Sequence, residues 1–242
     1  MAAVVEFRDV HYSIGGRAVL RGLNFEVGEG ETVSLLGRSG SGKTTALRLV
    51  NGVWYPAAGE VRVAGVPTRQ WDPVRLKRGI GYVIQDIGLF PHFTVARNVG
   101  LVPRLEGWPE GRIDARVREL LSMLELEPDR FMPRYPKELS GGQRQRVGVA
   151  RALAADPPVL LLDEPFGALD PVTRTEVQRQ FRGLSARLSK TAIFVTHDVR
   201  EALLLGTRVG VLHEGRLEVL ATPDEFRRSS GEEARRFLSC LE

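Results

Sequence analysis

The stretch 37-GRSGSGKT-44 decides the fold, because it matches the pattern G-x-x-x-x-G-K-[ST] at every required position. It follows an apolar run typical of a buried strand, 32-TVSLLG-37, and precedes a helical segment that ends near Gly52. A strand, such a loop and a helix in this order form the context in which the pattern cradles phosphate groups. A Gly/Ser-rich linker that matches by chance is the alternative, and the flanking strand and helix count against it.

The parts of this loop suit a nucleoside triphosphate with Mg²⁺. The glycines let the backbone wrap closely and point N–H groups at phosphate oxygens. Lys43 would carry its charge to the β- and γ-phosphates, and the Thr44 hydroxyl would ligate Mg²⁺. The residues of the loop predicted to contact the nucleotide are Gly37, Arg38, Ser39, Gly40, Ser41, Gly42, Lys43, Thr44 and Thr45.

A second motif, 159-VLLLDEP-165, supplies acidic groups at the end of a strand. Its apolar residues predict a buried strand, and Asp163 would stand at the carboxyl end, where ligands bind in open α/β sheets. We expect Asp163 to hold Mg²⁺ through water, and the adjacent Glu164 to act on the attacking water as general base. Two solvated acids in a turn are the alternative, which the complete phosphate loop disfavours.

Composition restricts the class of protein. The 242 residues carry a net charge of +4 without a run of five or more like charges, so charge patterning gives no support to nucleic-acid binding. The single cysteine, Cys240, predicts a reducing compartment. The longest apolar stretches, such as 202-ALLLG-206, are too short to span a bilayer, and the start, MAAVVEFRDV, lacks the features of a signal peptide. Work at a membrane would therefore require docking on another chain.

Strand patterns alternate with helical patterns, which predicts a parallel α/β core. In the segment 112–126, five apolar residues recur at helical spacing on one face: Ile113, Val117, Leu120, Leu121 and Leu124. This segment belongs to a mostly helical stretch between Pro91 and about Ala155, and one or two polar helices are expected in 223–242. Strands are predicted at 4–10, 19–27, 32–37, 59–66, 80–84, 159–163, 192–196 and 208–213.

The segment 139-LSGGQRQRV-147 resembles the signature sequence of ABC-type ATPases in content and in position. Its 140-SGG-142 leads into a helix and forms a second phosphate-cradling nest, with Ser140 suited to cap the helix. The resemblance implies that Ser140, Gly141, Gly142 and Gln143 of one subunit close on the nucleotide held by another. A nest with no lysine or metal ligand of its own suits half of a shared site.

Three further residues match family elements. Gln85, after the strand pattern 80–84, resembles the glutamine that touches Mg²⁺ and the attacking water. Asp170, in 167-GALD-170, resembles the aspartate near the dimer interface, and His197, in 196-THD-198, the switch histidine that contacts the γ-phosphate. The resemblance therefore implies catalytic roles for Lys43, Gln85, Glu164 and His197, and metal contacts for Thr44, Gln85 and Asp163. The other histidines, His11, His92 and His213, are expected to be structural.

The resemblance implies an α/β fold, the P-loop NTPase core of the ABC ATPase type with an N-terminal antiparallel β subdomain and a helical insertion. We expect one domain over 1–242, in which 1–85 and 156–242 form the β subdomain and the RecA-like core. Residues 86–155 would form the helical subdomain with the signature. ATP and Mg²⁺ are the implied cofactors.

The sequence departs from the family at the position that stacks an aromatic ring on adenine. Counted back from 15-GGRAVL-20, that position is Ile14, and Tyr12 lies two residues earlier. Ile14 can give an apolar contact to the base, whereas aromatic stacking requires Tyr12. The departure concerns base discrimination and nucleotide affinity, and not phosphate binding.

The stretches 73–108 and 134–174 look like the ATPases of bacterial importers of osmoprotectants such as glycine betaine and choline. We expect a shorter member, without the paired C-terminal regulatory modules that many of them carry. The implied partners are a second ATPase subunit in a homodimer, a membrane permease and, indirectly, an external solute-binding protein, with no nucleic acid. The implied location is the cytoplasmic face of the membrane. The permease would dock near 86-DIGLFPHFTV-95 through Leu89, Phe90 and Phe93.

Three alternatives remain open. A soluble ABC ATPase of DNA repair or translation is disfavoured, because the interval from phosphate loop to signature is short and each motif occurs once. A non-catalytic module is disfavoured by the presence of Lys43, Gln85, Asp163, Glu164 and His197. A transporter for another solute, for lipid or for export stays possible, because solute choice lies in other subunits.

Overall fold

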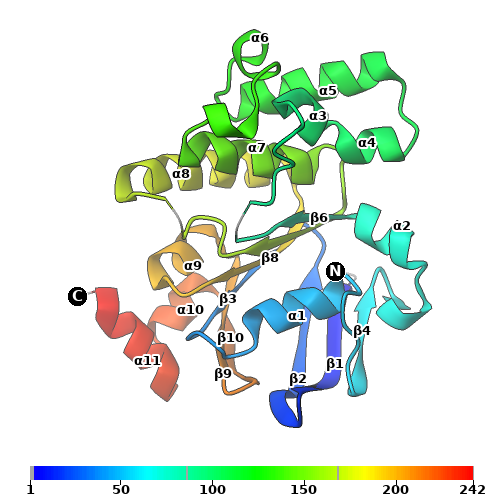
Figure 1. Cartoon of the computed structure of the whole chain (residues 1–242). Coiled ribbons are helices and arrows are strands. Elements are labelled where there is room, and N and C mark those ends of the chain that lie inside the picture. Colours follow the sequence, from blue (N-terminus) through cyan, green and yellow to red (C-terminus); the bar gives the residue numbers. More distant parts are fainter. Residues whose placement is uncertain (1–2, 86, 168, 242) are drawn as a thin grey trace. The chain divides into compact units, whose positions relative to one another are not determined.

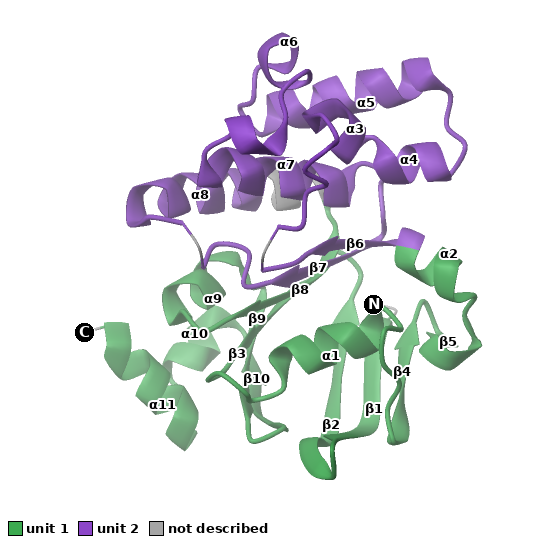
Figure 2. Cartoon of the chain, viewed as in Figure 1, with its two compact units in different colours: residues 1–77, 189–242 green, residues 78–188 purple. Residues whose placement is uncertain are grey.

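The computed structural model of the chain describes residues 3–85, 87–167 and 169–241. They form two compact units (Figures 1 and 2), Met1–Lys77 with Ser189–Glu242, called unit 1, and Arg78–Leu188, called unit 2. The predicted subdomain boundaries at 86 and 155 stay a prediction.

Unit 1 contains most of the strands. They are β1 (Ala3–Ile14), β2 (Arg17–Gly28), β3 (Thr32–Leu36), β4 (Ala58–Val63), β5 (Val66–Pro67), β8 (Thr191–Thr196), β9 (Arg208–His213) and β10 (Arg216–Ala221). The helices are α1 (Lys43–Val50), α2 (Pro73–Arg78, whose last residue belongs to unit 2), α9 (Val199–Leu205), α10 (Pro223–Arg227) and α11 (Glu232–Leu238). Short 3₁₀ turns lie at η1 (Thr68–Gln70) and η3 (Ser239–Leu241).

Strands β2, β1, β4 and β5 form an antiparallel sheet in this order. The β1–β2 hairpin is longer than the predicted strands and turns at Gly15 and Gly16, whose φ angles of 55° and 79° suit a two-residue turn. The rings of Phe7 and Phe25 stack on the buried face, with centroids 4.4 Å apart. This sheet agrees with the N-terminal antiparallel part that was predicted.

Strands β10, β9, β3 and β8 form the second sheet of unit 1. β3 pairs in parallel with both β8 and β9, and every residue of β3 and β8 is buried, as expected for a parallel sheet covered on both faces. Helices α9, α10 and α11 cover one part of it through a core of Leu36, Val199, Ala202, Val209, Val211, Phe226 and Ala234. The predicted parallel α/β core is confirmed, and β10 is a strand that the sequence analysis missed.

Unit 2 joins two strands to a group of helices. Its elements are β6 (Ile80–Val83), α3 (Val95–Val99), α4 (Leu101–Leu105), α5 (Glu110–Met123), α6 (Pro128–Phe131), η2 (Pro136–Glu138), α7 (Gly141–Leu153), β7 (Val159–Asp163) and α8 (Pro171–Leu188). β6 and β7 pair in parallel, and α7 packs against β6, α3, α5 and α8. The predicted apolar face of the helix in 112–126 is buried at all five positions, which confirms that prediction.

Candidate functional site

The phosphate loop connects β3 to α1 in unit 1 and needs its glycines for two different reasons. Gly40 and Gly42 have φ angles of 79° and 107°, in the left-handed region that side chains disfavour. At Gly37 an added Cβ would lie 2.4 Å from the carbonyl oxygen of Leu212. The loop therefore needs glycine at 37 for close contact with a neighbouring backbone carbonyl, and at 40 and 42 for left-handed backbone conformations, as the motif predicted.

Lys43 is the first residue of α1 and its side chain is buried. The Nζ donates hydrogen bonds to the carbonyl oxygens of Gly37, at 2.7 Å, and Arg38, at 3.0 Å. The ammonium group is therefore held over the start of the loop. Thr44 is half-buried beside it.

Ser41 shows that the loop fits a polar ligand. Its Oγ is buried and has no hydrogen-bond partner among the described residues. A buried hydroxyl without a partner is costly unless something else satisfies it. The carbonyl of Ser41 accepts a hydrogen bond of 3.2 Å from the N–H of Gly215, so the β9–β10 turn supports the loop.

His197 belongs to the same edge of the sheet as the phosphate loop. Leu36 and Thr196 are parallel partners at the carboxyl ends of β3 and β8. Gly37 and His197 follow them, and the His197 side chain is exposed. The register thus brings the loop and the predicted switch histidine to one edge, which is where open α/β sheets bind ligands.

The acidic groups lie in unit 2. Asp163 ends β7 with a buried side chain, and Tyr82 Oη donates to its Oδ2 at 3.3 Å. Val83 of β6 is the parallel partner of Leu162, so Gln85, which is exposed, follows a strand that ends beside Asp163. Two parallel strands therefore bring these predicted metal contacts to one edge.

Glu164 has an unusual backbone. Its φ angle is 45°, a left-handed conformation that costs a non-glycine residue roughly 1–2 kcal/mol. Strain of this kind is common at functional sites, where it sets the direction of a side chain. The Glu164 side chain is half-buried, whereas that of Asp163 is buried. The two neighbouring acids therefore differ in exposure, and their roles stay predictions.

The signature segment begins α7 with a capping box. Ser140 Oγ accepts from the N–H of Gln143 at 3.3 Å, and Gln143 Oε1 accepts from the N–H of Ser140 at 3.0 Å. Gly141 is half-buried and Gly142 buried. At Gly142 an added Cβ would lie 2.3 Å from Cγ2 of Thr173 in α8. The predicted cap is confirmed, and this glycine permits close packing of two helices.

Asp170 precedes α8 and is exposed. Its Oδ1 accepts from the N–H of Thr173 at 3.1 Å. Hydrogen bonds from the side chain and backbone of Thr173 hold the pKa of Asp170 below its usual value, so the carboxylate stays charged. Ala168, within the predicted 167–170 motif, lies outside the described residues.

The predicted base contacts differ in their surroundings. Tyr12 stacks on Trp54, with ring centroids 5.3 Å apart and 12° between planes, and the guanidinium of Arg48 lies 4.6 Å from the Trp54 centroid. Ile14 is 49% exposed at the end of the hairpin. One face of Tyr12 is thus covered by Trp54, a residue that sequence reasoning did not select. Either base contact stays a prediction.

The predicted permease-docking stretch is held by a buried asparagine. Asn98 Oδ1 accepts from the N–H of Phe90 at 2.8 Å, and Nδ2 donates to the carbonyls of Phe90 and Phe93 at 3.1 Å. Leu89 and Phe93 are half-buried, and Phe90 is 41% exposed. Asp86, the first residue of the predicted stretch, lies outside the described residues.

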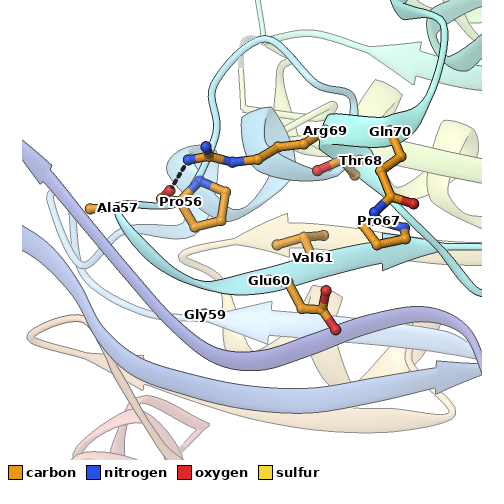
Figure 3. Close-up of a pocket in the computed structure, with 9 residues that line it drawn as sticks. All are labelled: Pro56, Ala57, Gly59, Glu60, Val61, Pro67, Thr68, Arg69 and Gln70. Atoms are coloured by element: carbon orange, nitrogen blue, oxygen red, sulfur yellow. Dashed lines mark hydrogen bonds between the residues drawn. The ribbon is translucent and has the colours of Figure 1, made fainter.

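Unit 1 has a cavity beside β4 and β5 (Figure 3). It has a volume of about 350 Å³ and is bounded by Pro56, Glu60, Val61, Pro67, Thr68 and Arg69. It contains none of the predicted nucleotide contacts. Its position beside β4 and β5 gives no reason to move the candidate site.

Among the described residues no group of three or more His, Cys, Asp or Glu side chains could hold a metal ion. Mg²⁺ is commonly bound by one or two carboxylates together with substrate phosphates, so Asp163 fits a metal that a nucleotide brings. Within the same part of the chain, no helix has the length and apolar character to cross a bilayer.

Known proteins resemble this chain in sequence and structure. A family model described as "ABC transporter" matches residues 20–167. The osmoprotectant import ATP-binding protein of Salmonella typhimurium is 51% identical over 84% of this chain and 53% of its own length. The glycine betaine/carnitine/choline transport ATP-binding protein of Bacillus subtilis is 47% identical over 90% of this chain and 57% of its own length. The chain thus spans about half the length of these curated relatives.

A solved structure agrees with the fold. The dimeric, post-hydrolysis state of an ATP-binding cassette bound to ADP and Pi matches with a TM-score of 0.80 and 36% sequence identity. The match covers 90% of this chain and 98% of that chain. It confirms the predicted fold class.

Proposed function

Since the chain belongs to the ABC transporter family, we propose that it is the ATP-binding and ATP-hydrolysing subunit that powers import of a solute. The observation that carries the proposal is the phosphate loop, with Lys43 Nζ held over the carbonyls of Gly37 and Arg38 and the buried Ser41 Oγ without a partner among the described residues. These groups suit a phosphate chain, which can take over the ammonium group and satisfy the hydroxyl.

The residues of the chain divide the work of hydrolysis. Lys43 and the N–H groups of the loop bind the phosphates and stabilise the charge that develops during transfer. Glu164 takes a proton from the attacking water, while Gln85 and His197 orient that water and the γ-phosphate. Bound Mg²⁺ would neutralise phosphate charge, and Thr44, Gln85 and Asp163 would hold it.

A second copy of the subunit completes the site. The nest formed by Ser140, Gly141 and Gly142 has the phosphate-binding character of a helix start and no lysine within it. We assign it to the nucleotide of the partner subunit, with Gln143 beside it and Asp170 near the interface. The similar cassette of known structure is a dimer with ADP and Pi, which supports this assignment. Loss of the γ-phosphate would let the two subunits separate.

The relatives support a proposal for the membrane partner and the solute. We propose that the subunit works at the cytoplasmic face of the membrane on a permease that docks near Leu89, Phe90 and Phe93. Relatives named for import of osmoprotectants, glycine betaine, carnitine and choline support a quaternary amine as solute. The permease and an external binding protein would select it, so another solute is the alternative.

Uptake in cells tests the proposal. Cells that carry this protein and the neighbouring transporter genes are compared with cells that carry the Glu164→Gln form, after osmotic upshift and with labelled glycine betaine and choline. Uptake that requires Glu164 supports both the direction and the solute class. No uptake in either strain, with ATP turnover intact in the purified wild-type protein, would remove the osmoprotectant assignment and leave the ATPase.

A further inference from the structure

The turn that carries His197 is braced by a buried pair of side chains. Thr196 Oγ1 donates to Glu201 Oε2 at 2.6 Å and accepts from the N–H of Asp198 at 3.0 Å. Thr196 is 1% exposed and Glu201 is 5% exposed. One hydroxyl therefore connects the end of β8, the turn after His197 and the first turn of α9.

The chemistry of this hydroxyl fixes its orientation. A threonine hydroxyl has one proton and two lone pairs, and the proton goes to the carboxylate in a short, charge-assisted bond. A lone pair is then directed at the N–H of Asp198, whose own side chain accepts from the N–H of Arg200 at 2.8 Å and caps α9. The backbone is thus fixed at the residues before and after His197.

A buried carboxylate is costly to keep in a protein core. The helix start has a cap in Asp198, and the hydrolysis steps assigned above use neither Thr196 nor Glu201. The His197 side chain is exposed at the edge of the sheet. The backbone that this pair fixes on both sides of His197 sets the direction in which the imidazole leaves the strand end.

We propose that Glu201 and Thr196 are positioning residues for His197, which hold the 196–198 turn in the conformation that presents the imidazole to the γ-phosphate. The inference rests on the proposed function, in which His197 contacts that phosphate. Both side chains are buried, so we expect ATP affinity, which the phosphate loop determines, not to depend on them.

The test is ATP turnover and ATP affinity of the full chain with Thr196→Val, which keeps the shape and removes the hydroxyl. We expect kcat to fall about tenfold, the effect of a lost buried hydrogen bond that acts only on the reacting state. The ATP dissociation constant should stay within about twofold, since the phosphate loop is unchanged. Thr196→Ser, which restores the hydroxyl, should recover most of the turnover.

Thr191→Val is the matched control. Thr191 is buried on the same strand, and its Oγ1 accepts from the N–H of Gly30 at 3.0 Å, at the end of β8 away from His197. We expect this variant to lose stability without losing kcat. Equal turnover in Thr196→Val and Thr191→Val would overturn the inference, because the hydroxyl would then serve stability alone.

Two further variants keep the test decisive. If Thr196→Val does not fold, Glu201→Gln takes its place, because it retains a hydrogen-bond acceptor and removes the charge. A lower kcat in this variant at unchanged ATP affinity supports the inference. A normal kcat overturns it. His197→Ala separates the role of His197 from the positioning role of Thr196 and Glu201. If it keeps full turnover, the proposed role of His197 is wrong; if it is inactive while Thr196→Val is fully active, only the positioning role is wrong.

Discussion

The guanidinium of Arg38 lies against the carboxylate of Glu233, with 3.1 Å between Nε and Oε2. The phosphate loop is therefore tied to α11, nearly two hundred residues later in the chain. The Glu233 side chain is buried and also contacts Arg236 and lies 3.6 Å from Nδ1 of His213. Because its side chain is engaged by α11, Arg38 would meet a nucleotide through its backbone.

This contact predicts a loss of stability in Glu233→Gln. The neutral side chain removes the anion that Arg38 and Arg236 share. We expect the free energy of unfolding to fall by about 1 kcal/mol, a small value because solvent screens the exposed Arg38. Thermal unfolding should show a decrease in Tm of roughly 2–4 °C. Glu232→Gln is the control, since Glu232 pairs with Arg236 but is exposed. Equal Tm values for the two variants would contradict the prediction.

Lys43→Ala should weaken ATP binding itself. The ammonium group is buried and held over the loop by two carbonyl oxygens, ready to exchange them for phosphate oxygens. Calorimetric titration should show at least a tenfold loss of affinity, the equivalent of one charge-assisted contact. Lys77→Ala removes an exposed lysine and should bind normally. Unchanged affinity in Lys43→Ala would argue against the assigned phosphate loop.

Gly142→Ala should strain the junction of α7 and α8. The new methyl group would lie 2.3 Å from Thr173 Cγ2, and overpacking of this kind costs about 1–3 kcal/mol. Thr173→Ser removes that methyl group, so the double variant should recover the stability measured by urea unfolding. Gly111→Ala in α5 is the control, because a Cβ added there would meet no neighbouring atom within 4 Å outside its own stretch of helix. This variant should be neutral or stabilising. A double variant no more stable than Gly142→Ala would exclude this contact as the cause.

The hydrogen bonds of Asp170 predict a small dependence of folding stability on pH in the acid range. Thr173 lowers the folded-state pKa of this carboxyl below its unfolded value. The contribution to stability is therefore present above the unfolded pKa and is lost as pH falls through the folded pKa. Asp170→Asn should be less stable than the wild type near neutral pH, and the difference should shrink in acid. A difference that grows on acidification would contradict the assigned hydrogen bond.

The sequence predicted features that depend on local patterns. The glycine pattern of 37–44 and the buried strand before it identified the phosphate loop, and the apolar face of 112–126 identified α5. β10 was missed although residues 216–219 alternate between exposed and half-buried; none of its residues is fully buried, and its pairing with β9 defines the strand.

Other features could not be found from local patterns. The stacking of Tyr12 on Trp54 and the contact between Arg38 and Glu233 join segments that are far apart in the sequence. The left-handed φ angle of Glu164 falls on a residue that is not glycine, so no residue type signals it. Of the site residues, Lys43, Gly37 and His197 come to one sheet edge in unit 1, while Gln85 and Asp163 share an edge in unit 2. The sequence motifs predicted which residues belong to the site, and the strand register shows which of them end at the same sheet edge.

The most direct measurement is phosphate release from Mg-ATP by the purified wild-type protein and by Glu164→Gln, with ATP affinity measured on the same samples. The substitution keeps the size of the side chain and removes the proton acceptor. We predict that turnover falls by about 10²-fold or more, while ATP affinity changes by less than about twofold. Turnover in Glu164→Gln close to that of the wild type would contradict the assignment of Glu164 as the base and the mechanism built on it.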